Sequence, residues 1–419
     1  MKIVSVLSIL FIVIFAHPSW AQVAHEMAAP PYIKTVQFRG NTDLGQLPII
    51  QLGQPLFLSF DDIIGDEASY FYTITHYNAD WTPSILAKSE YMDGMDNVRI
   101  FNQENSVSTL QLYTHYTLGI PNRNTRGLTK TGNYILKITD SEGELIFSRK
   151  FMIFNPTLAV GVEIKRSRDL QFVNNKQVVR FFVDGGNTLL IDPKRNVKTV
   201  IIQNNDLNTA IAGLVPQYNI GNKLEYRYDQ ESAFWGGNEF FNFDSKDVRN
   251  ATAAISHVEL KNLYHHHLYT NITRAYEKYT FNPDINGNFT VTTLQGDDPT
   301  IEAEYAWAHI SLDHIRLAAD KEVHIYGNFN NYTLDESTLM AFNLEKNRYE
   351  LPILLKQGFY NFRYVVTDLD RNIIGPNVID GDFWQTENDY RVLVYYRAPG
   401  ARFDALLGVG NGNSSTITN

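Results

Sequence analysis

The fold class is decided by the stretch Gly132-Asn-Tyr-Ile-Leu-Lys-Ile138, the turn Asp140-Ser-Glu-Gly143, and the following stretch Leu145-Ile-Phe-Ser-Arg-Lys-Phe-Met-Ile-Phe154. Both outer stretches are rich in aliphatic and aromatic residues, whereas Asp, Ser and Gly between them form turns. Two such runs joined by a short turn predict a β-hairpin. The 24 Tyr and 25 Phe residues also favour strands over helices. We therefore expect an all-β chain.

Similar runs precede this hairpin and define a first region, residues 22–155. They are short, rich in strand-forming residues and regularly spaced, at residues 33–38, 55–60, 70–77 and 108–113. Six or seven strands at this spacing are typical of an immunoglobulin-like β-sandwich.

The rest of the chain predicts two more sandwiches and a tail. Residues 156–300 are expected to form a second β-sandwich with long loops, and a short helix at residues 208–212 is compatible with the sequence. Residues 301–407 predict an early-set-like β-sandwich. Residues 408–419 are mostly Gly, Asn, Ser and Thr, which predicts a flexible tail. The expected architecture is thus a tandem array of immunoglobulin-like and early-set β-sandwich domains.

Residues 1–21 have the pattern of a cleaved signal peptide. Lys2 precedes an apolar run that is shorter than the roughly 20 residues of a membrane-spanning helix, and small residues Ser19 and Ala21 precede Gln22. The chain contains no cysteine, so the exported protein has neither a disulfide nor a thioether lipid anchor. We expect a soluble, exported protein.

The charge of the chain excludes some partners. The formal net charge is −10, and no run rich in Lys or Arg occurs. A nucleic-acid binder needs a basic footprint, so nucleic acid is not an expected partner. The acidity also argues against adhesion to anionic lipid.

The most prominent motif is His265-His-His267. Imidazole side chains bind zinc and copper, so this motif is a candidate metal site. Successive strand residues point to opposite faces, so at most two of the three can share a ligand shell. No Asp, Glu or Cys lies within five residues, and we expect a polar strand and no metal. A metallohydrolase that uses this cluster stays as an alternative.

Other motifs give no catalytic residue and no cofactor. Asp284-Ile-Asn-Gly-Asn288 opens like a calcium loop, but no closing glutamate follows, so a hairpin turn is expected. The adjacent acids Asp61 and Asp62 are typical of a solvated turn. No Gly-x-Ser-x-Gly elbow occurs. The chain is not expected to be an enzyme.

Two aromatic loop blocks are candidates for binding a partner, because aromatics beside Gly and Asn make rigid contact surfaces. The first lies at residues 76–83 and runs on to residues 89–94, and the second lies at residues 234–243. The candidate residues are Tyr77, Asp80, Trp81, Trp235, Asn238, Glu239 and Phe240. The competing interpretation is that these aromatic side chains are core residues that fill the ends of their sandwiches.

A second function is suggested by Ile325-Tyr-Gly-Asn-Phe-Asn-Asn-Tyr332. This stretch looks like the Gly-x-Phe-Asn-x-Trp stretch of early-set domains found beside starch-acting enzymes. Tyr332 and Trp384 are then candidate glycan-stacking residues, in a periplasmic glycan-binding protein. The same stretch is a strand and turn in domains that bind no sugar.

Taken together, collinear blocks make the chain resemble the type IX secretion system plug protein family of Bacteroidota. They include Tyr72-Thr-Ile-Thr-His-Tyr-Asn-Ala-Asp-Trp81, Thr131-Gly-Asn-Tyr-Ile-Leu-Lys137 and Leu355-Lys-Gln-Gly-Phe-Tyr-Asn361. The others lie at residues 89–94, 113–118, 236–244, 284–288, 386–388 and 393–397. The resemblance spans roughly residues 33 to 407.

The resemblance implies a periplasmic protein that docks on the outer-membrane translocon barrel (SprA/Sov type). It would block the periplasmic opening of that barrel when the barrel is idle. The implied mechanism is steric, and the family supplies no catalytic residues.

Overall fold

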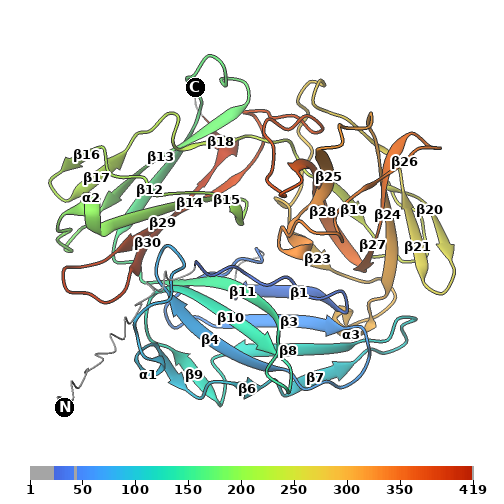
Figure 1. Cartoon of the computed structure of the whole chain (residues 1–419), viewed down its shortest axis with the longest axis horizontal. Helices are drawn as coiled ribbons and strands as arrows, with labels where there is room; N and C mark the ends of the chain where they lie inside the picture. Colours follow the sequence, from blue (N-terminus) through green and yellow to red (C-terminus); the bar gives the residue numbers. More distant parts are fainter. Residues whose placement is uncertain (1–22, 42–44, 418–419) are drawn as a thin grey trace, which may run out of the picture.

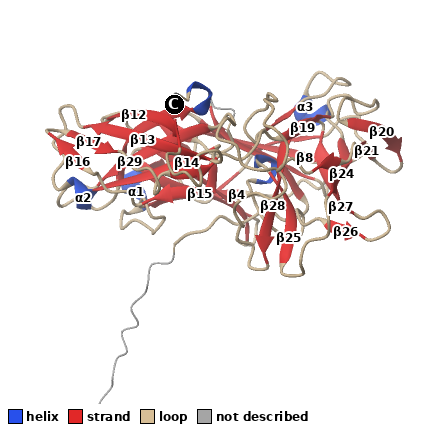
Figure 2. Cartoon of the chain, turned by 90° about the horizontal axis from the view of Figure 1, so that it is seen from above, coloured by secondary structure: helices blue, strands red, loops and turns tan. Residues whose placement is uncertain are grey.

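The computed structural model describes residues 23–41 and 45–417, and the predicted signal peptide lies outside them. The chain is almost entirely β, as expected, and its strands form three β-sandwiches arranged around a common centre (Figure 1). A view at right angles shows that the helices are short turns at the edges of the sheets (Figure 2). None of the helices within the described ranges has the length and apolar character needed to cross a bilayer.

Sandwich 1 comprises residues 33–154. One sheet has the order β1 (Ile33–Gly40), β3 (Leu56–Asp62), β8 (Thr114–Ile120), β7 (Asn102–Asn105). The other has the order β2 (Ile49–Gln51), β11 (Leu145–Phe154), β10 (Gly132–Thr139), β4 (Phe71–Tyr77), β6 (Val98–Arg99). Helix α1 (Lys88–Tyr91) and the pair β5 (Met92–Gly94) and β9 (Thr125–Leu128) lie beside them.

The hairpin that decides the fold class forms as predicted. Strands β10 and β11 pair antiparallel from Gly132 opposite Ile153 onwards. Their inward side chains enter an aromatic core, in which the rings of Phe147 and Phe60 meet edge to face at 5.2 Å. Each such buried side chain contributes about 1.5–3 kcal/mol of apolar burial, which is what stabilises a chain without disulfides.

Sandwich 2 comprises residues 159–235 and 389–413. One sheet contains β12 (Ala159–Arg166), β13 (Lys176–Asp184), β17 (Lys223–Tyr226), β16 (Tyr218–Ile220) and β18 (Ala233–Trp235). The facing sheet has the order β15 (Asp206–Ala212), β14 (Val197–Gln203), β29 (Asp389–Tyr396), β30 (Ala405–Asn413). Helix α2 (Pro193–Asn196) precedes β14, and the 3-10 turn η2 (Ser414–Thr416) follows β30.

Sandwich 3 comprises residues 241–368. One layer contains β19 (Phe241–Asp244), β28 (Gly358–Asp368), β23 (Phe289–Val291) and β25 (Lys321–Tyr326). The other contains β20 (Ile255–Leu260), β21 (Tyr264–Leu268), β22 (Asn271–Ile272), β24 (Tyr305–Asp313), β27 (Arg348–Lys356) and β26 (Ala341–Asn343). Helix α3 (Pro299–Glu302) and the 3-10 turn η1 (Asn328–Asn330) lie between strands.

The predicted boundary between the second and third sandwiches is wrong. Residues 156–300 and 301–407 are not two consecutive domains, because sandwich 3 is inserted between β18 and β29 of sandwich 2. The central pair of sandwich 2 joins Val197 of β14 to Tyr396 of β29. A strand pattern predicts that a strand exists, but it does not say which distant strand will pair with it.

Two local predictions are also wrong. The expected tail at residues 408–419 starts inside β30, whose Leu406 is fully buried. Gly410 faces β12, and an added Cβ there would lie 2.6 Å from Val160 Cγ1, so the glycines permit close sheet packing rather than flexibility. Residues 208–212 are part of strand β15 and not a helix, because they pair with β14.

Candidate functional site

The first aromatic block, residues 76–83, lies where sandwich 1 meets sandwich 2. The backbone N–H of Ala79 donates to Asp404 Oδ2 at 3.1 Å. Tyr77 is buried, with its ring 6.3 Å from that of Trp81. Trp81 is half-buried under Lys150, whose Nζ lies 4.4 Å from the ring, and Asp80 is exposed. Asp80 and Trp81 are therefore the members of this block that a partner can reach.

The second block is the segment that leads from sandwich 2 into sandwich 3, and it is mostly buried. Trp235 is half-buried, whereas Asn238, Glu239 and Phe240 are buried. Asn238 Nδ2 donates to the backbone oxygen of Asp380 at 2.8 Å. The junction between the two sandwiches is closed by Asn238, Glu239 and Phe240, which are therefore not accessible to a partner.

The proposed glycan platform does not form. Tyr332 is only 3% exposed, its ring packs 4.9 Å from that of Tyr326, and its hydroxyl donates to the Asn204 backbone oxygen at 3.0 Å. A ring enclosed in this way cannot stack on a sugar, so the prediction for Tyr332 is wrong. Trp384 is half-buried beneath the guanidinium of Arg166, 4.7 Å away.

The contact between sandwiches 1 and 3 is centred on a buried carboxylate. Asp61, which the sequence suggested would lie in a solvated turn, is 0% exposed. Lys356 Nζ lies 2.7 Å from its Oδ2, His115 Nδ1 lies 2.5 Å from its Oδ1, and the Tyr305 hydroxyl donates to Oδ2 at 2.7 Å. Lys356 also lies 4.0 Å above the ring of Tyr113. Burial lowers the pKa of Lys356, and the adjacent Asp61 opposes that shift.

The other two contacts between sandwiches are also centred on a buried aspartate. Between sandwiches 2 and 3, the Tyr326 hydroxyl donates to Asp206 at 2.7 Å. Between sandwiches 1 and 2, Asp404 Oδ2 accepts the backbone N–H of Ala79 at 3.1 Å, and within sandwich 2 Asp404 pairs with Arg397 Nε at 2.8 Å and Lys198 Nζ at 3.0 Å. Asp206 and Asp404 are 3% and 0% exposed. We call Asp61, Asp206 and Asp404 the three bracing aspartates. Because a buried carboxylate is costly to unpair, each favours one relative placement of its two sandwiches.

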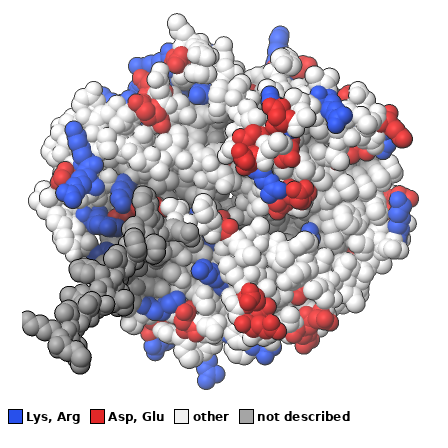
Figure 3. Space-filling model, viewed as in Figure 1, with Lys and Arg blue, Asp and Glu red and all other residues white. Residues whose placement is uncertain are grey.

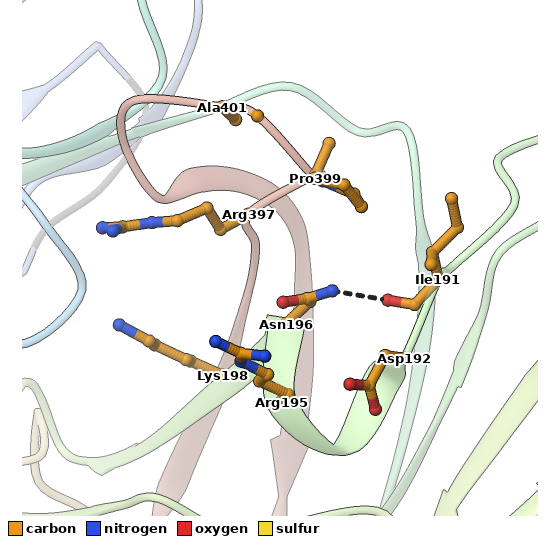
Figure 4. A pocket seen from close by; sticks show the side chains of 10 residues that line it. Ile191, Asp192, Arg195, Asn196, Lys198, Arg397, Pro399 and Ala401 are labelled. Atoms are coloured by element: carbon orange, nitrogen blue, oxygen red, sulfur yellow. Dashed lines mark hydrogen bonds between the residues drawn. The ribbon is translucent and has the colours of Figure 1, made fainter.

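A basic pocket of about 600 Å³ opens beside the third contact, between α2 and the loop that joins β29 to β30 (Figure 4). Arg195, Lys198 and Arg397 extend towards the same side of it (Figure 4). Lys198 and Arg397 are paired with Asp404, whereas the structure gives Arg195 no ion pair within the ranges it describes. The three cations thus outnumber the two nearby carboxylates, Asp404 and Asp192, by one. Over the visible face both signs of charge are interspersed (Figure 3).

The histidine cluster is a stack of rings rather than a ligand shell. His257, His267 and His309 are neighbours across three adjacent strands, with ring centroids 4.2 and 4.3 Å apart. His265 Nδ1 lies 2.8 Å from His309 Nε2, and His266 points the other way, to the backbone oxygen of Val248. Among the described residues, no three His, Cys, Asp or Glu side chains are grouped to hold a metal ion.

This stack predicts a loss of stability in acid. Burial, together with the neighbouring His267 and His265, lowers the pKa of His309 to about 4. An unfolded histidine titrates near 6.5, so between those pH values the folded state binds fewer protons and stability falls as the pH falls. We expect the His309→Gln variant to reduce that loss by ~1–2 kcal/mol, after allowance for solvent screening at a half-buried site. Urea unfolding at pH 7.5, 6 and 5 measures it, and equal pH slopes in both proteins would contradict the prediction.

Comparison with known proteins bears on both the family and the fold. Residues 33–155 match the family model for the type 9 secretion system plug protein 1st domain. No curated protein matches the chain. The crystal structure of a hypothetical protein from Parabacteroides merdae ATCC 43184 has a TM-score of 0.88 and 29% identity, over 93% of this chain and 98% of that chain.

Two other solved structures are much less similar. Domains 3–5 of the Drosophila OTK extracellular region give a TM-score of 0.14 at 11% identity, over 93% of this chain and 98% of that one. The S. aureus collagen adhesin gives 0.11 at 8% identity, over 93% and 95%. Both similarities are too low to show a shared fold. The N-terminal sandwich, residues 33–155, matches the first domain of type 9 secretion system plug proteins, and this match supports a role related to type 9 secretion.

Proposed function

We propose that this chain is a periplasmic, non-enzymatic plug subunit of the type 9 secretion system. It docks on the periplasmic face of the outer-membrane translocon barrel (SprA/Sov type) and blocks the opening when the barrel is idle. The match of residues 33–155 to the plug family's first domain carries the proposal. A wide barrel leaves an aqueous channel, so a folded body held at its mouth is sufficient to stop diffusion.

The bracing aspartates support a steric mechanism. A body that blocks a channel must keep its shape under thermal motion. Three sandwiches joined only by flexible linkers would change their positions relative to one another. Here each pair of sandwiches shares a buried, hydrogen-bonded carboxylate, Asp61, Asp206 or Asp404. The candidates for contact with the barrel are the exposed Asp80 and the half-buried Trp81, at the edge between sandwiches 1 and 2.

The test is a pull-down from outer membranes through a tag on this chain, combined with a permeability assay. We expect the tagged chain and its Trp384→Ala control to recover the translocon barrel, and the Asp80→Ala/Trp81→Ala variant to recover several-fold less. A strain that lacks the chain should become more sensitive to bulky hydrophilic antibiotics. Failure of the unmodified chain to recover the barrel contradicts docking, and unchanged sensitivity in the deletion strain contradicts blocking.

A further inference from the structure

A cavity of about 340 Å³ lies between sandwiches 1 and 3. Strand β1 and the segment before it form one wall, and strands β23, β27 and β28 with turn η1 form the other (Figure 1). The walls are largely apolar. Their apolar side chains include Ile33, Val36, Phe289, Phe329, Ile353 and Leu355. This size and lining are typical of a site for a small molecule.

Of the three cations that line the cavity, Arg371 is paired with Glu336, whereas Arg149 and Lys34 form no ion pair within the described residues. Arg149 is 6% exposed, and the one hydrogen bond that the described structure gives its guanidinium runs from Nη1 to the backbone oxygen of Ser148. Its guanidinium otherwise lies 5.3 Å from the ring of Phe147. Lys34 is half-buried, and its Nζ forms no hydrogen bond or ion pair within the described ranges. Burial lowers the pKa of both groups, and the charges of Glu26 and Asp335 oppose that shift for Arg149 and Lys34 respectively.

The nearby carboxylates are occupied elsewhere. Glu26 accepts hydrogen bonds from the Lys150 backbone N–H and from Asn331. Asp335 accepts from Ser337, and Glu336 pairs with Arg371 at 2.9 Å. An arginine cannot release its proton, and an unpaired buried charge costs several kcal/mol. Arg149 and Lys34 therefore face the cavity without a carboxylate at ion-pair distance, and a carboxylate bound there would supply one.

A local irregularity in β1 contributes to this arrangement. The pairing of β1 with β3 shifts register between Lys34 and Gln37, and Thr35 has a φ of 51°, in the left-handed region. A bulge of this kind interrupts the ladder and re-aims side chains. A non-glycine residue in this conformation is uncommon and marks backbone that its surroundings hold in place. The Thr35 side chain bonds the Tyr305 hydroxyl at 2.6 Å, which ties the bulge to sandwich 3.

We propose that this cavity binds a monocarboxylate with an apolar body, of the medium-chain fatty acid class. The carboxylate would pair with Arg149 and Lys34, and the chain would lie against Phe289, Phe329 and Leu355. A guanidinium matches a carboxylate in a two-pronged fork, and the apolar walls exclude a fully polar anion. This site is independent of docking on the barrel, and no residue of it belongs to the contact candidates named above.

The test uses the purified mature chain with sodium decanoate, below its micelle concentration, and with 1-decanol and inorganic phosphate as controls. We expect calorimetry to show decanoate binding, with decanol about tenfold weaker or more and no heat from phosphate. The Arg149→Met and Lys34→Met variants should each lose about tenfold or more in decanoate affinity, whereas Arg168→Met, an exposed arginine of sandwich 2, should not.

Three outcomes would overturn the proposal: equal binding of decanoate and decanol, binding of phosphate alone, or unchanged affinity in both Met variants. Thermal melting without ligand provides a check on folding. Because a buried unpaired charge is removed, Arg149→Met should melt no lower than the unmodified chain. If Arg149→Met fails to fold, Lys34→Met alone decides. Barrel recovery is measured separately, so failure here leaves the docking proposal unaffected.

Discussion

Replacing Lys356 with Met is expected to lower the free energy of unfolding by about 3–5 kcal/mol, the usual effect of removing one partner from a buried ion pair. Asp61 would stay fully buried between sandwiches 1 and 3, with His115 and the Tyr305 hydroxyl as its remaining side-chain partners. Urea unfolding, followed by tryptophan fluorescence, measures the loss. We also expect faster amide exchange in β24 and β27, which lie at this contact.

A second substitution and a surface control make this result specific. The Asp61→Asn/Lys356→Met double variant removes both charges and should recover more than half of the lost stability. Lys346→Met breaks an exposed pair with Glu350 and should change stability by less than about 1 kcal/mol. If Lys356→Met unfolds like Lys346→Met, the Asp61 contact does not brace the two sandwiches.

Ending the chain at Asp404 is expected to unfold sandwich 2 while leaving sandwich 1 folded. The truncation removes β30, which pairs with β29 from Asp389 to Tyr396 and covers β12. Sandwich 2 would lose the buried Leu406 and an entire edge of one sheet. We expect limited proteolysis to cut within residues 159–235 and to spare residues 33–154. A truncated chain with the protease resistance of the full chain would contradict this prediction.

Glycine variants test the same strand without shortening the chain. At Gly410 a new Cβ would meet Val160 Cγ1 at 2.6 Å and Val162 Cγ2 at 2.7 Å. Gly410→Val should therefore cost about 1–3 kcal/mol through overpacking. Gly127, in β9, has no atom within 4 Å of such a Cβ, so Gly127→Val should stay within about 0.5 kcal/mol. Equal melting of the two variants would show that β12 and β30 are not packed closely.

Local pattern predicted the fold class because the determining signals are local. The hairpin at residues 132–154 has strand-forming runs on both sides of a turn, and all of that information lies within 23 residues or so of the chain. Strand β30 was missed because Gly408, Gly410 and Gly412 resemble a linker in composition. Their role depends on the approach of β12, more than 240 residues earlier by position, which no local window contains.

The candidate site was predicted less well for a related reason. Whether an aromatic residue is exposed depends on what covers it, and Phe240 and Tyr332 are covered by parts of the chain that are distant in sequence. Asp61 looked like a turn residue because its partner Lys356 comes almost 300 positions later. A signal was available in Lys356 itself, since a lysine that ends the apolar run Leu351-Pro-Ile-Leu-Leu355 is a candidate for a buried ion pair.

The insertion of sandwich 3 into sandwich 2 also sets the order in which the body can be completed. Sandwich 3 draws all its strands from residues 241–368 and can close as soon as they are available. Sandwich 2 starts earlier, at β12, but it needs β29 and β30 from the far end of the chain. During synthesis, domains fold as their segments emerge. Sandwich 2 therefore stays incomplete until β30 has been synthesised. Only then can the Asp404 contact join it to sandwich 1.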